Sequence, residues 1–565
     1  MLSQVILITK LVGVILRVSL SSLRWKLTSI IHRHTYKQTD SRNIVVIGAS
    51  FAGYHAARCL ANSLPTGYRV IVIEKNSHFQ LTWVLPRFCV VEGHEHKAFI
   101  PYSPYIKGPD GACLWIHDTV TAIQPTETGG KVQVLSGDWI DYEYLVIATG
   151  SSARLPSRVD WDSKEEGMIA LRGQQQRFKR AEDIVVIGGG AAGVELATDL
   201  KSHFPKKNVT PIHSHKKLLG EGFGEKIHNV VKKEMEVLGV DLVLGERPAI
   251  PDGVTGEIAL SDRTIHFDCL VKCTGQKPNT DLVRFLDPSA FSPSGHLRVQ
   301  ETLQVNDDRH CRIYAAGDVI DAGIKNGRSA MQQGQTVSEN IVRSIQGRRQ
   351  INYRQQWWEG LTKITVGLVS DLKPSSDQFL TERQGKSVAY VSDGQGELTM
   401  TLRQKTELDS AAVWKHLGAT PFQDHHKVLM SVTAQELEIL STKAIGAKAT
   451  AYCPYSKFQV GACILTTSGE FITGANVENA AYPVGTCAER VAFGTAVVAG
   501  HKDFKALAVA TNISPPASPC GMCRQFIREF TGPQFPVYMY DGEGNHKVMT
   551  MDELLPDSFG PEQLK

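Results

Sequence analysis

Two stretches of the chain place a short apolar run directly before a glycine-rich turn. One runs from Asn43 to Gly53 and the other from Ile184 to Gly193, and each is followed by a helical pattern and a further apolar run, Val70–Glu74 or Val209–Ile212. Apolar, β-branched runs of four or five residues bounded by glycine are typical of buried parallel strands. Because the unit recurs about 140 residues later, the pattern predicts two doubly wound α/β domains.

Three later stretches show other patterns. Residues 360–402 alternate more strongly and predict a smaller β-rich module, residues 407–427 are typical of a polar connection, and a helical pattern begins again near Thr433. A chain of 565 residues is too long for one hydrophobic core. Its 61 Lys and Arg nearly balance 58 Asp and Glu, so the net charge of +3 gives no reason to expect nucleic acid. Eleven unevenly spaced Cys indicate a reducing compartment.

Residues 1–40 differ in kind from the rest. Lys10, Arg17 and Arg24 recur every seven positions, and no acidic residue precedes Asp40. The apolar run of residues 5–20 is interrupted by basic side chains and is short for a bilayer span. Such a segment is typical of a mitochondrial presequence or an interfacial membrane anchor, which predicts a mitochondrial or membrane-associated protein. The alternative is a disordered tail, with a cytoplasmic location.

The two glycine-rich turns are suited to binding dinucleotides. Such a turn lets backbone N–H groups approach a pyrophosphate at a helix N-terminus, and an acidic residue about twenty positions later bonds the ribose. The first turn has Gly48, Ser50 and Gly53, and Glu74 ends the following strand. The Ser50 side chain narrows the approach to phosphate, although its hydroxyl is able to donate a hydrogen bond.

The second turn has all three glycines, Gly188, Gly190 and Gly193. At the end of its second strand there is no carboxylate, and residues 213–217 read His-Ser-His-Lys-Lys. This cluster is able to accept a 2′-phosphate, so NADPH is allowed beside NADH. The alternative is a solvated basic loop.

Three further strands extend the pattern. Residues 144–150 and 269–275 each end in Thr-Gly, and residues 313–319 contain Gly317 and Asp318. Residues 43–370 thereby resemble the two-dinucleotide flavoproteins of the pyridine nucleotide-disulfide oxidoreductase type, and most closely the apoptosis-inducing-factor-like and type II NADH dehydrogenase-like members. The resemblance implies two Rossmann-like domains that bind FAD and NAD(P)H. It assigns FAD to Gly48, Ser50, Gly53, Glu74, Thr149, Gly150, Gly317 and Asp318, and the nicotinamide cofactor to Gly188, Gly190, Gly193 and Glu195.

Disulfide-using members of that superfamily place two closely spaced cysteines against the flavin. Here the region after Glu74 offers only Cys89, while Cys269 and Cys273 lie in or beside a strand, where packing is the expected role. Electrons are therefore expected to pass directly from the flavin to a quinone, dioxygen or a one-electron acceptor. The cofactor carries the hydride chemistry, so few catalytic side chains are expected.

A second chemical pattern lies near the C-terminus. Cys487 and Glu489 form a Cys-x-Glu motif, and Cys520 and Cys523 form a Pro-Cys-x-x-Cys motif 33 residues later. Three thiols fit a zinc ion with one position open for water, whereas a structural zinc usually has four protein ligands. Glu489 is placed to move protons between water and substrate, and Arg490 to offset the thiolate charge. The alternative is a purely structural zinc site.

Motifs on either side complete a second resemblance. Together with residues 455–462, 474–479 and 554–561, the cysteine motifs make about the last 130 residues similar to the small, homotetrameric cytidine deaminases. That resemblance implies that Phe458 flanks the base, that Asn476 and Glu478 bond the ribose 3′ hydroxyl, and that Phe559 reaches a neighbouring subunit. An Asn/Glu pair that binds a free sugar hydroxyl disfavours polynucleotides, because a phosphodiester would occupy that site. The alternative for this pair is a turn between strands.

Together the patterns predict an α/β protein with two Rossmann-like domains and a C-terminal α/β/α deaminase domain. It is expected to deaminate cytidine and deoxycytidine, in pyrimidine salvage, and to oxidise NAD(P)H through FAD. The alternatives are a deaminase tethered to a redox-sensing flavoprotein and a deaminase of single-stranded nucleic acid. A misjoined gene model would also produce this order of domains. The expected ranges are 1–40 (targeting or membrane association), 41–155 and 286–350 (FAD), 156–285 (NAD(P)H), 351–405 (β-rich module), 406–428 (linker) and 429–565 (deaminase).

Overall fold

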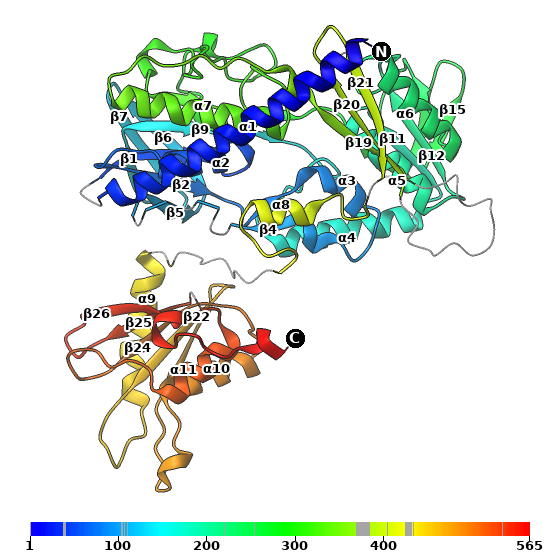
Figure 1. Cartoon of the computed structure of the whole chain (residues 1–565). Coiled ribbons are helices and arrows are strands. Elements are labelled where there is room, and N and C mark those ends of the chain that lie inside the picture. The colour runs from blue at the N-terminus through cyan, green and yellow to red at the C-terminus, as the bar shows by residue number, and fades with distance from the viewer. Residues whose placement is uncertain are drawn as a thin grey trace. The chain divides into compact units, whose positions relative to one another are not determined.

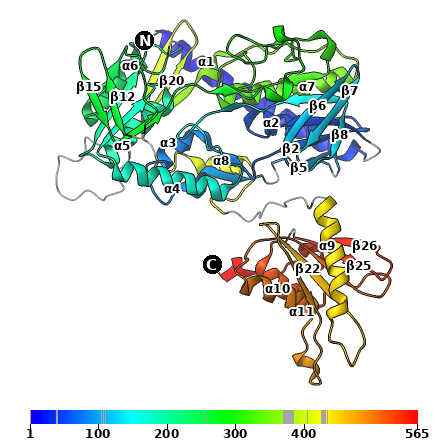
Figure 2. The same ribbon diagram turned by 180° about the vertical axis from the view of Figure 1, so that it is seen from behind.

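The structure, a computed structural model, divides into two compact units. Unit 1 is Met1–Gln423 and unit 2 is Asp424–Lys565 (Figures 1 and 2). The described residues are 2–37, 41–102, 105–106, 108–109, 111–220, 222–253, 255–368, 385–403, 405–423, 432, 434–533 and 535–564. Within these residues, no helix is long and apolar enough to cross a membrane.

The first sheet of unit 1 has five parallel strands in the order β18-β9-β1-β2-β5. Its inner strands are almost wholly buried, which explains the continuous apolar runs of the sequence. The strands are β1 (Arg42–Ile47), β2 (Tyr68–Glu74), β5 (Cys113–His117), β9 (Tyr144–Ile147) and β18 (Ile313–Ala315), and the associated helices are α2 (Phe51–Ala61) and α7 (Gly327–Ile345).

The second sheet has four parallel strands in the order β13-β12-β11-β16. A short antiparallel pair, β10 with β17, joins the two chain segments that run between the two sheets. The elements of this part are β10 (Ser151–Ser152), β11 (Asp183–Ile187), α5 (Ala191–His203), β12 (Asn208–His213), α6 (Glu225–Leu238), β13 (Val243–Leu244), β14 (Gly256–Ala259), β15 (Thr264–Phe267), β16 (Cys269–Lys272) and β17 (Lys277–Pro278).

Smaller elements complete unit 1. Helix α1 (Leu2–Thr35) lies along the unit, and the β-rich module is the antiparallel sheet β19-β20-β21 (Figure 1). The remaining elements are β3 (His78–Gln80), α3 (Leu85–Phe88), β4 (Phe99–Pro101), β6 (Val120–Thr126), β7 (Gly129–Val134), β8 (Trp139–Tyr142), α4 (Lys164–Arg180), β19 (Thr362–Val366), β20 (Lys386–Ser392), β21 (Glu397–Arg403) and α8 (Ser410–His416).

Helix α8 corrects the expectation of a linker over residues 406–428. Trp414, in this helix, is completely buried, and its indole N–H donates to the Lys97 carbonyl at 3.0 Å. Lys97 also forms an ion pair with Glu407. The segment is polar on average, so its one large apolar side chain, Trp414, did not stand out in the sequence. Burial of this side chain attaches the segment to unit 1, which extends to Gln423. Residues 424–428 of the expected linker lie outside the described residues.

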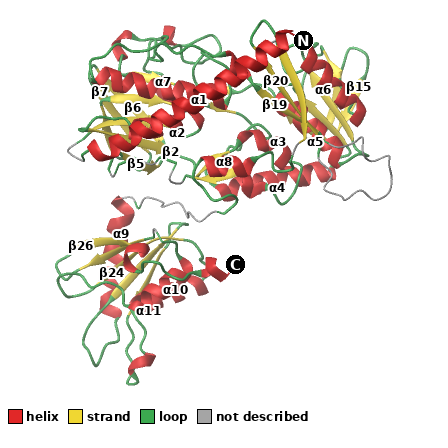
Figure 3. Ribbon diagram, in the orientation of Figure 1, coloured by secondary structure: helices red, strands yellow, loops and turns green. Residues whose placement is uncertain are grey.

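Unit 2 is built on a mixed five-stranded sheet in the order β23-β22-β24-β25-β26 (Figure 3). All of β22 is buried because its side chains alternate between two cores. Cys463 and Leu465 face the core with α9, whereas Ala462 and Ile464 face the core with α10 and α11. The elements are α9 (Ala434–Ala447), β22 (Gly461–Thr466), β23 (Phe471–Ala475), α10 (Ala488–Val498), β24 (Phe504–Ala510), α11 (Gly521–Phe530), β25 (Pro536–Tyr540), β26 (His546–Thr550) and α12 (Met551–Leu554). The predicted α/β fold class is confirmed.

Candidate functional site

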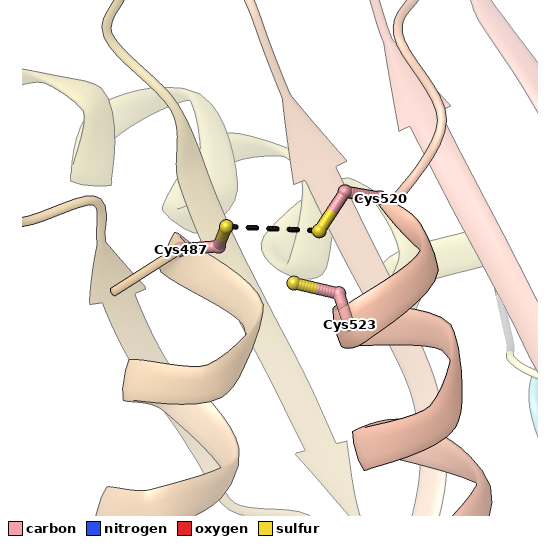
Figure 4. A group of neighbouring side chains, drawn as sticks. All are labelled: Cys487, Cys520 and Cys523. Atoms are coloured by element: carbon pink, nitrogen blue, oxygen red, sulfur yellow. Dashed lines mark hydrogen bonds between the residues drawn. The ribbon is translucent and has the colours of Figure 1, made fainter. Parts of the chain in front are cut away.

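Three cysteines meet at the starts of two helices in unit 2. Cys487 is the N-cap of α10, Cys520 is the N-cap of α11, and Cys523 lies in the first turn of α11. Their sulfurs lie within 4.8 Å of one another, with 3.9 Å between Cys487 Sγ and Cys520 Sγ (Figure 4). The N-terminus of a helix is electropositive, so both helix starts favour thiolates here.

The sulfur geometry fits zinc. Zn–S bonds of about 2.3 Å in a tetrahedral site place sulfurs about 3.8 Å apart. Among the described residues, no fourth His, Cys, Asp or Glu ligand joins this cluster. The hydrogen bond with Cys523 is the largest influence that lowers the pKa of Cys487, and Cys520 and Arg490 lower it further. The same contact raises the pKa of Cys523, so the cluster offers three sulfur ligands with Cys487 as the thiolate.

Glu489 and Arg490 flank the sulfurs. Glu489 is 4% exposed, and burial raises the pKa of its carboxyl to about 6. Arg490 Nη2 donates to the Gly485 carbonyl at 3.0 Å, and its guanidinium also hydrogen-bonds Cys487. A buried carboxylate and a cation therefore lie beside the three sulfurs.

A cavity of about 370 Å³ lies in unit 2, lined by Tyr455, Ser456, Glu478, Asn479, Tyr482 and Gly485. The Glu478 carboxylate accepts hydrogen bonds from the backbone N–H groups of Tyr455 and Ser456, at 2.9 and 3.2 Å. These bonds fix the carboxylate at the cavity wall. Sequence reasoning missed Tyr455 and Tyr482, whose exposed aromatic rings pack edge to face at 6.2 Å. The sequence signal that could have identified these two residues is the presence of large aromatic side chains in polar, glycine-containing loops.

Three other residues that were predicted to bind substrate are not among those that line the cavity: Asn476, Phe458 and Phe559. The Asn476 amide donates to the Phe458 carbonyl at 2.8 Å and accepts from Val460 N–H at 2.9 Å. Both polar atoms of Asn476 therefore hold the backbone around Phe458, a role that the sequence did not indicate. Phe458 is 36% exposed and Phe559 is 57% exposed.

In unit 1 the two glycine-rich turns have the conformation that dinucleotide binding requires. Gly48 and Gly188 have φ of +91° and +118°. A Cβ on Gly53 would lie 1.8 Å from the Gly48 carbonyl oxygen, and one on Gly193 would lie 1.9 Å from that of Gly188. By contrast, a Cβ on Gly190 would meet nothing within 4 Å. That open space at the start of α5 fits a phosphate, so the second turn fits a dinucleotide.

Side chains around the first turn are also arranged for a cofactor. The Glu74 carboxylate, 5% exposed, accepts from the N–H of Ala49 in the turn and from Asn76 N–H at 2.8 Å. Ser50 caps α2 but makes no side-chain capping hydrogen bond. Glu74 thus lies at the end of β2 beside the turn, where a ribose would bind.

Three predicted residues around the strand ends mainly connect parts of unit 1. Thr149 Oγ1 donates to the Asn279 carbonyl at 2.7 Å, and Asn279 N–H donates to the Gly150 carbonyl at 3.0 Å. Asp318 accepts from Ser151 Oγ at 3.2 Å, beside Gly317, which has φ of +87°. These contacts bring the Thr-Gly and Gly-Asp strand ends together.

Glu195 has a structural partner that the motif did not indicate. Its buried carboxylate accepts from both the backbone N–H and the hydroxyl of Thr365 in β19, each at 3.0 Å. Burial raises the pKa of Glu195 to about 7. The residue therefore attaches the β-rich module to α5, one helical turn from the buried Arg87–Asp199 ion pair.

Cys269 and Cys273 lie in or beside β16, where packing was expected. Cys89 and Cys269 are buried, and Cys273 is half-buried. Burial raises the pKa of the Cys273 thiol to about 12 and also raises that of Cys89, to which the nearby Cys273 contributes. All three are present as free thiols.

Comparisons with known proteins match both units. The family described as "Pyridine nucleotide-disulphide oxidoreductase" matches residues 42–334, and the "Cytidine and deoxycytidylate deaminase zinc-binding region" matches residues 434–539. Fe-regulated protein 8 of Mycosarcoma maydis is 34% identical over 390 residues, covering 65% of this chain and 94% of that protein. The cytidine deaminase of Sporosarcina psychrophila is 45% identical over 129 residues, covering 23% and 95%. Apoptosis-inducing factor homolog B of Dictyostelium discoideum is 26% identical over 307 residues, covering 50% and 76%.

These matches confirm the predicted fusion of an apoptosis-inducing-factor-like flavoprotein with a cytidine deaminase. They also support the three expected cofactors, Zn²⁺, FAD and NAD(P)H. Both matched families are families of enzymes.

Proposed function

The chain belongs to the pyridine nucleotide-disulphide oxidoreductase family and ends in a cytidine deaminase domain, and on this premise we propose that it is a bifunctional enzyme. Unit 2 hydrolyses cytidine and deoxycytidine to uridine or deoxyuridine and ammonia, in pyrimidine salvage. Unit 1 oxidises NAD(P)H through FAD. The observation that carries the first activity is the cluster of three sulfurs beside the buried carboxylate of Glu489.

The proposed deamination divides its work among few residues. Cys487, Cys520 and Cys523 would hold zinc, which supplies the Lewis acidity that lets water ionise near neutral pH. Glu489 takes a proton from the attacking water and delivers it to N3 of the pyrimidine, where it stays in the product. Glu489 then transfers the remaining proton of that water to the amine, which departs as ammonia. Glu478, held at the cavity wall by two backbone N–H groups, binds the sugar hydroxyl. Asn476 positions Phe458 beside the base through the backbone.

The deaminase proposal is tested with the purified full-length protein. Cytidine and deoxycytidine turnover is followed by the loss of ultraviolet absorbance, and zinc is measured on the same sample. Glu489→Gln is expected to keep zinc and lower kcat by a factor of about 10² or more, because a positioned proton donor contributes at least that much. Failure of the zinc-loaded protein to deaminate either nucleoside would overturn the proposal, and an unchanged kcat in Glu489→Gln would overturn the role of Glu489.

In unit 1, FAD would lie against Gly48, Gly53, Glu74 and Asp318, and NAD(P)H against the turn containing Gly190. FAD accepts a hydride and passes electrons onward. Cys89 and Cys269 are buried and Cys273 is half-buried, all as free thiols, which supports direct transfer to a quinone or dioxygen. Steady-state oxidation of NAD(P)H with a soluble quinone tests this activity. Bound FAD without turnover would instead favour a redox-sensing module that tethers the deaminase.

We also propose that unit 2 assembles as a tetramer. Phe559 is 57% exposed, and Tyr482, which lines the cavity, is 77% exposed. A neighbouring copy that contributes Phe559 would cover these rings and complete the site. Light scattering measures the mass in solution; a monomer with full deaminase activity would exclude this assembly.

For location, we propose that α1 docks unit 1 onto a membrane surface, in the mitochondrion or elsewhere, rather than acting as a removed presequence. On its buried side, Leu7 is 1% exposed, and Lys10 binds Asp393 at 2.6 Å. His32 hydrogen-bonds the Leu64 carbonyl at 2.6 Å. A removed segment would need no such contacts.

The outer side of α1 supports that location. Most of its exposed apolar residues share one face at helical spacing, whereas Ile6 lies off that face. The residues on the shared face are Ile8, Val12, Ile15, Leu16 and Ile30. Cosedimentation with anionic vesicles is expected for the intact protein and not for an Ile8→Ser, Ile15→Ser variant. Equal binding by both proteins, or a native N-terminus beyond residue 35, would exclude docking through α1.

A further inference from the structure

The two glycine-rich turns of unit 1 correspond residue by residue, so the hydrogen bonds of equivalent residues in the two turns can be compared directly. In the first, Gly48 N–H donates to the Ile73 carbonyl at 2.9 Å, and the next N–H, that of Ala49, donates to the Glu74 carboxylate. In the second, Gly188 N–H donates to the Ile212 carbonyl at 2.8 Å, and the next N–H, that of Gly189, donates to His213 Nδ1 at 3.1 Å. His213 therefore occupies the position of the ribose-binding carboxylate.

This substitution reverses the hydrogen-bonding character of the position. A carboxylate only accepts hydrogen bonds. In His213, Gly189 N–H already occupies Nδ1, so the neutral ring carries its proton on Nε2. Nε2 is buried, and the Lys217 backbone also acts on the ring as a hydrogen-bond partner. The position therefore carries a ring N–H where the first turn carries a carboxylate acceptor.

Gly189 is adapted to the imidazole. A Cβ at this position would lie 2.7 Å from the His213 ring, so the turn accommodates the ring only with glycine. In the first turn, the corresponding residue facing Glu74 is Ala49. The close approach of Gly189 holds the His213 ring, which is 9% exposed, in one orientation.

The surface beyond His213 is cationic. The His215 ring lies 5.2 Å from that of His213, and both His215 and Lys216 are exposed. Lys217 is paired with Glu225 at 2.9 Å, so its charge is partly compensated. The adjacent acidic residue Glu246 donates its backbone N–H to the His213 carbonyl at 3.2 Å, and its carboxylate is hydrogen-bonded to Ser261.

We propose that this turn selects the 2′-phosphorylated cofactor, NADPH, over NADH. The 2′-phosphate would bind the charge of the exposed Lys216 and accept a hydrogen bond from the exposed His215 ring, with His213 in place of a carboxylate. A phosphate monoester carries close to two negative charges at neutral pH, so a carboxylate in this position would repel it. The inference rests on the proposed oxidation of NAD(P)H and names its substrate.

Binding of fragments isolates the ribose end from the redox chemistry. Calorimetry on the full-length protein compares adenosine 2′,5′-bisphosphate with adenosine 5′-monophosphate. The 2′-phosphorylated fragment is expected to bind at least tenfold more tightly, since a hydrogen bond to a charged group is worth about 1.5–3 kcal/mol. Lys216→Ala is expected to remove most of that preference. Lys232→Ala, which removes a charge from α6 of the same domain, is the matched control and is expected to retain it.

A reversal variant and kinetics complete the test. His213→Glu is expected to bind the monophosphate more tightly than the bisphosphate, and to shift the kcat/KM ratio from NADPH toward NADH. Equal binding of the two fragments by the unaltered protein, or loss of preference in Lys232→Ala as large as in Lys216→Ala, would overturn the inference. If the fragments bind as expected but neither dinucleotide is oxidised, the selectivity stands and the proposed oxidase activity fails.

Discussion

Replacing Arg87 by Met is expected to destabilise unit 1 by several kilocalories per mole. The Arg87 guanidinium is 1% exposed and the Asp199 carboxylate 0%. Two parallel N–H···O bonds of 2.9 Å join them, and a third bond of 3.1 Å reaches the Gly367 carbonyl. The pair therefore links α3, α5 and the chain after β19. Removing one partner of a buried pair costs about 3–5 kcal/mol, because the remaining charge stays buried.

The loss is expected to depend on pH. Burial already raises the pKa of Asp199 although Arg87 opposes this, and Met at position 87 would raise it further. A carboxyl whose pKa is higher in the folded than in the unfolded state binds protons on folding. Its contribution to stability is therefore present below the unfolded pKa of about 4 and is lost as pH rises through the folded pKa. Arg87→Met should be less destabilising at pH 5 than at pH 8.

The distribution of tryptophan supplies the assay. All eight tryptophans precede residue 424, so intrinsic fluorescence reports the urea unfolding of unit 1 in the full-length protein. The control is the double variant Arg87→Met, Asp199→Leu, which removes both charges and should recover most of the lost stability. A loss below about 1 kcal/mol in the single variant, or a double variant no more stable than the single one, would refute the reasoning.

Three further perturbations test other parts of the molecule. Cys520→Ser, or removal of the metal with a chelator, should abolish deamination and lower the melting temperature of unit 2. The control Cys453→Ser lies outside the sulfur cluster and should retain zinc, which metal analysis of both variants measures. Gly193→Ala places a Cβ against a carbonyl and should prevent stable folding of unit 1. Gly190→Ala should fold normally and bind dinucleotide more weakly. Equal melting temperatures of the two variants would contradict this. Glu195, with its pKa raised to about 7, binds a proton on folding. The free energy of unfolding should therefore fall between pH 5 and 8 by at most about 3 kcal/mol. Urea titrations at several pH values should show a smaller fall for Glu195→Gln.

Much of the fold and of the metal site was predictable because the signals are local. Apolar runs before glycine marked β1 and β11, since a strand buried in a parallel sheet has few polar positions. The three cysteines that we propose as zinc ligands were recognisable from the spacing of their motifs. Cys487, Cys520 and Cys523 all lie at helix starts, and a helix turn fixes the spacing of two of them.

The roles of other residues depended on distant partners. Glu195 bonds Thr365, which lies 170 residues later in the chain, and no local pattern indicates such a contact. Trp414 anchors α8 through Lys97, 317 residues away, within a sequence that is polar on average. Asn476 matches a sugar-binding motif, yet its amide is used by the backbone near Phe458.

The sequence alone therefore determined the kinds of domain, their order and the chemistry of the three thiols, because periodicity and motif spacing are properties of short segments. Only the tertiary structure decided which polar groups are already occupied by partners and which remain available to a ligand. Packing makes that choice, because burying a polar group without a hydrogen bond is costly and the chain satisfies it with whichever residue the fold brings near.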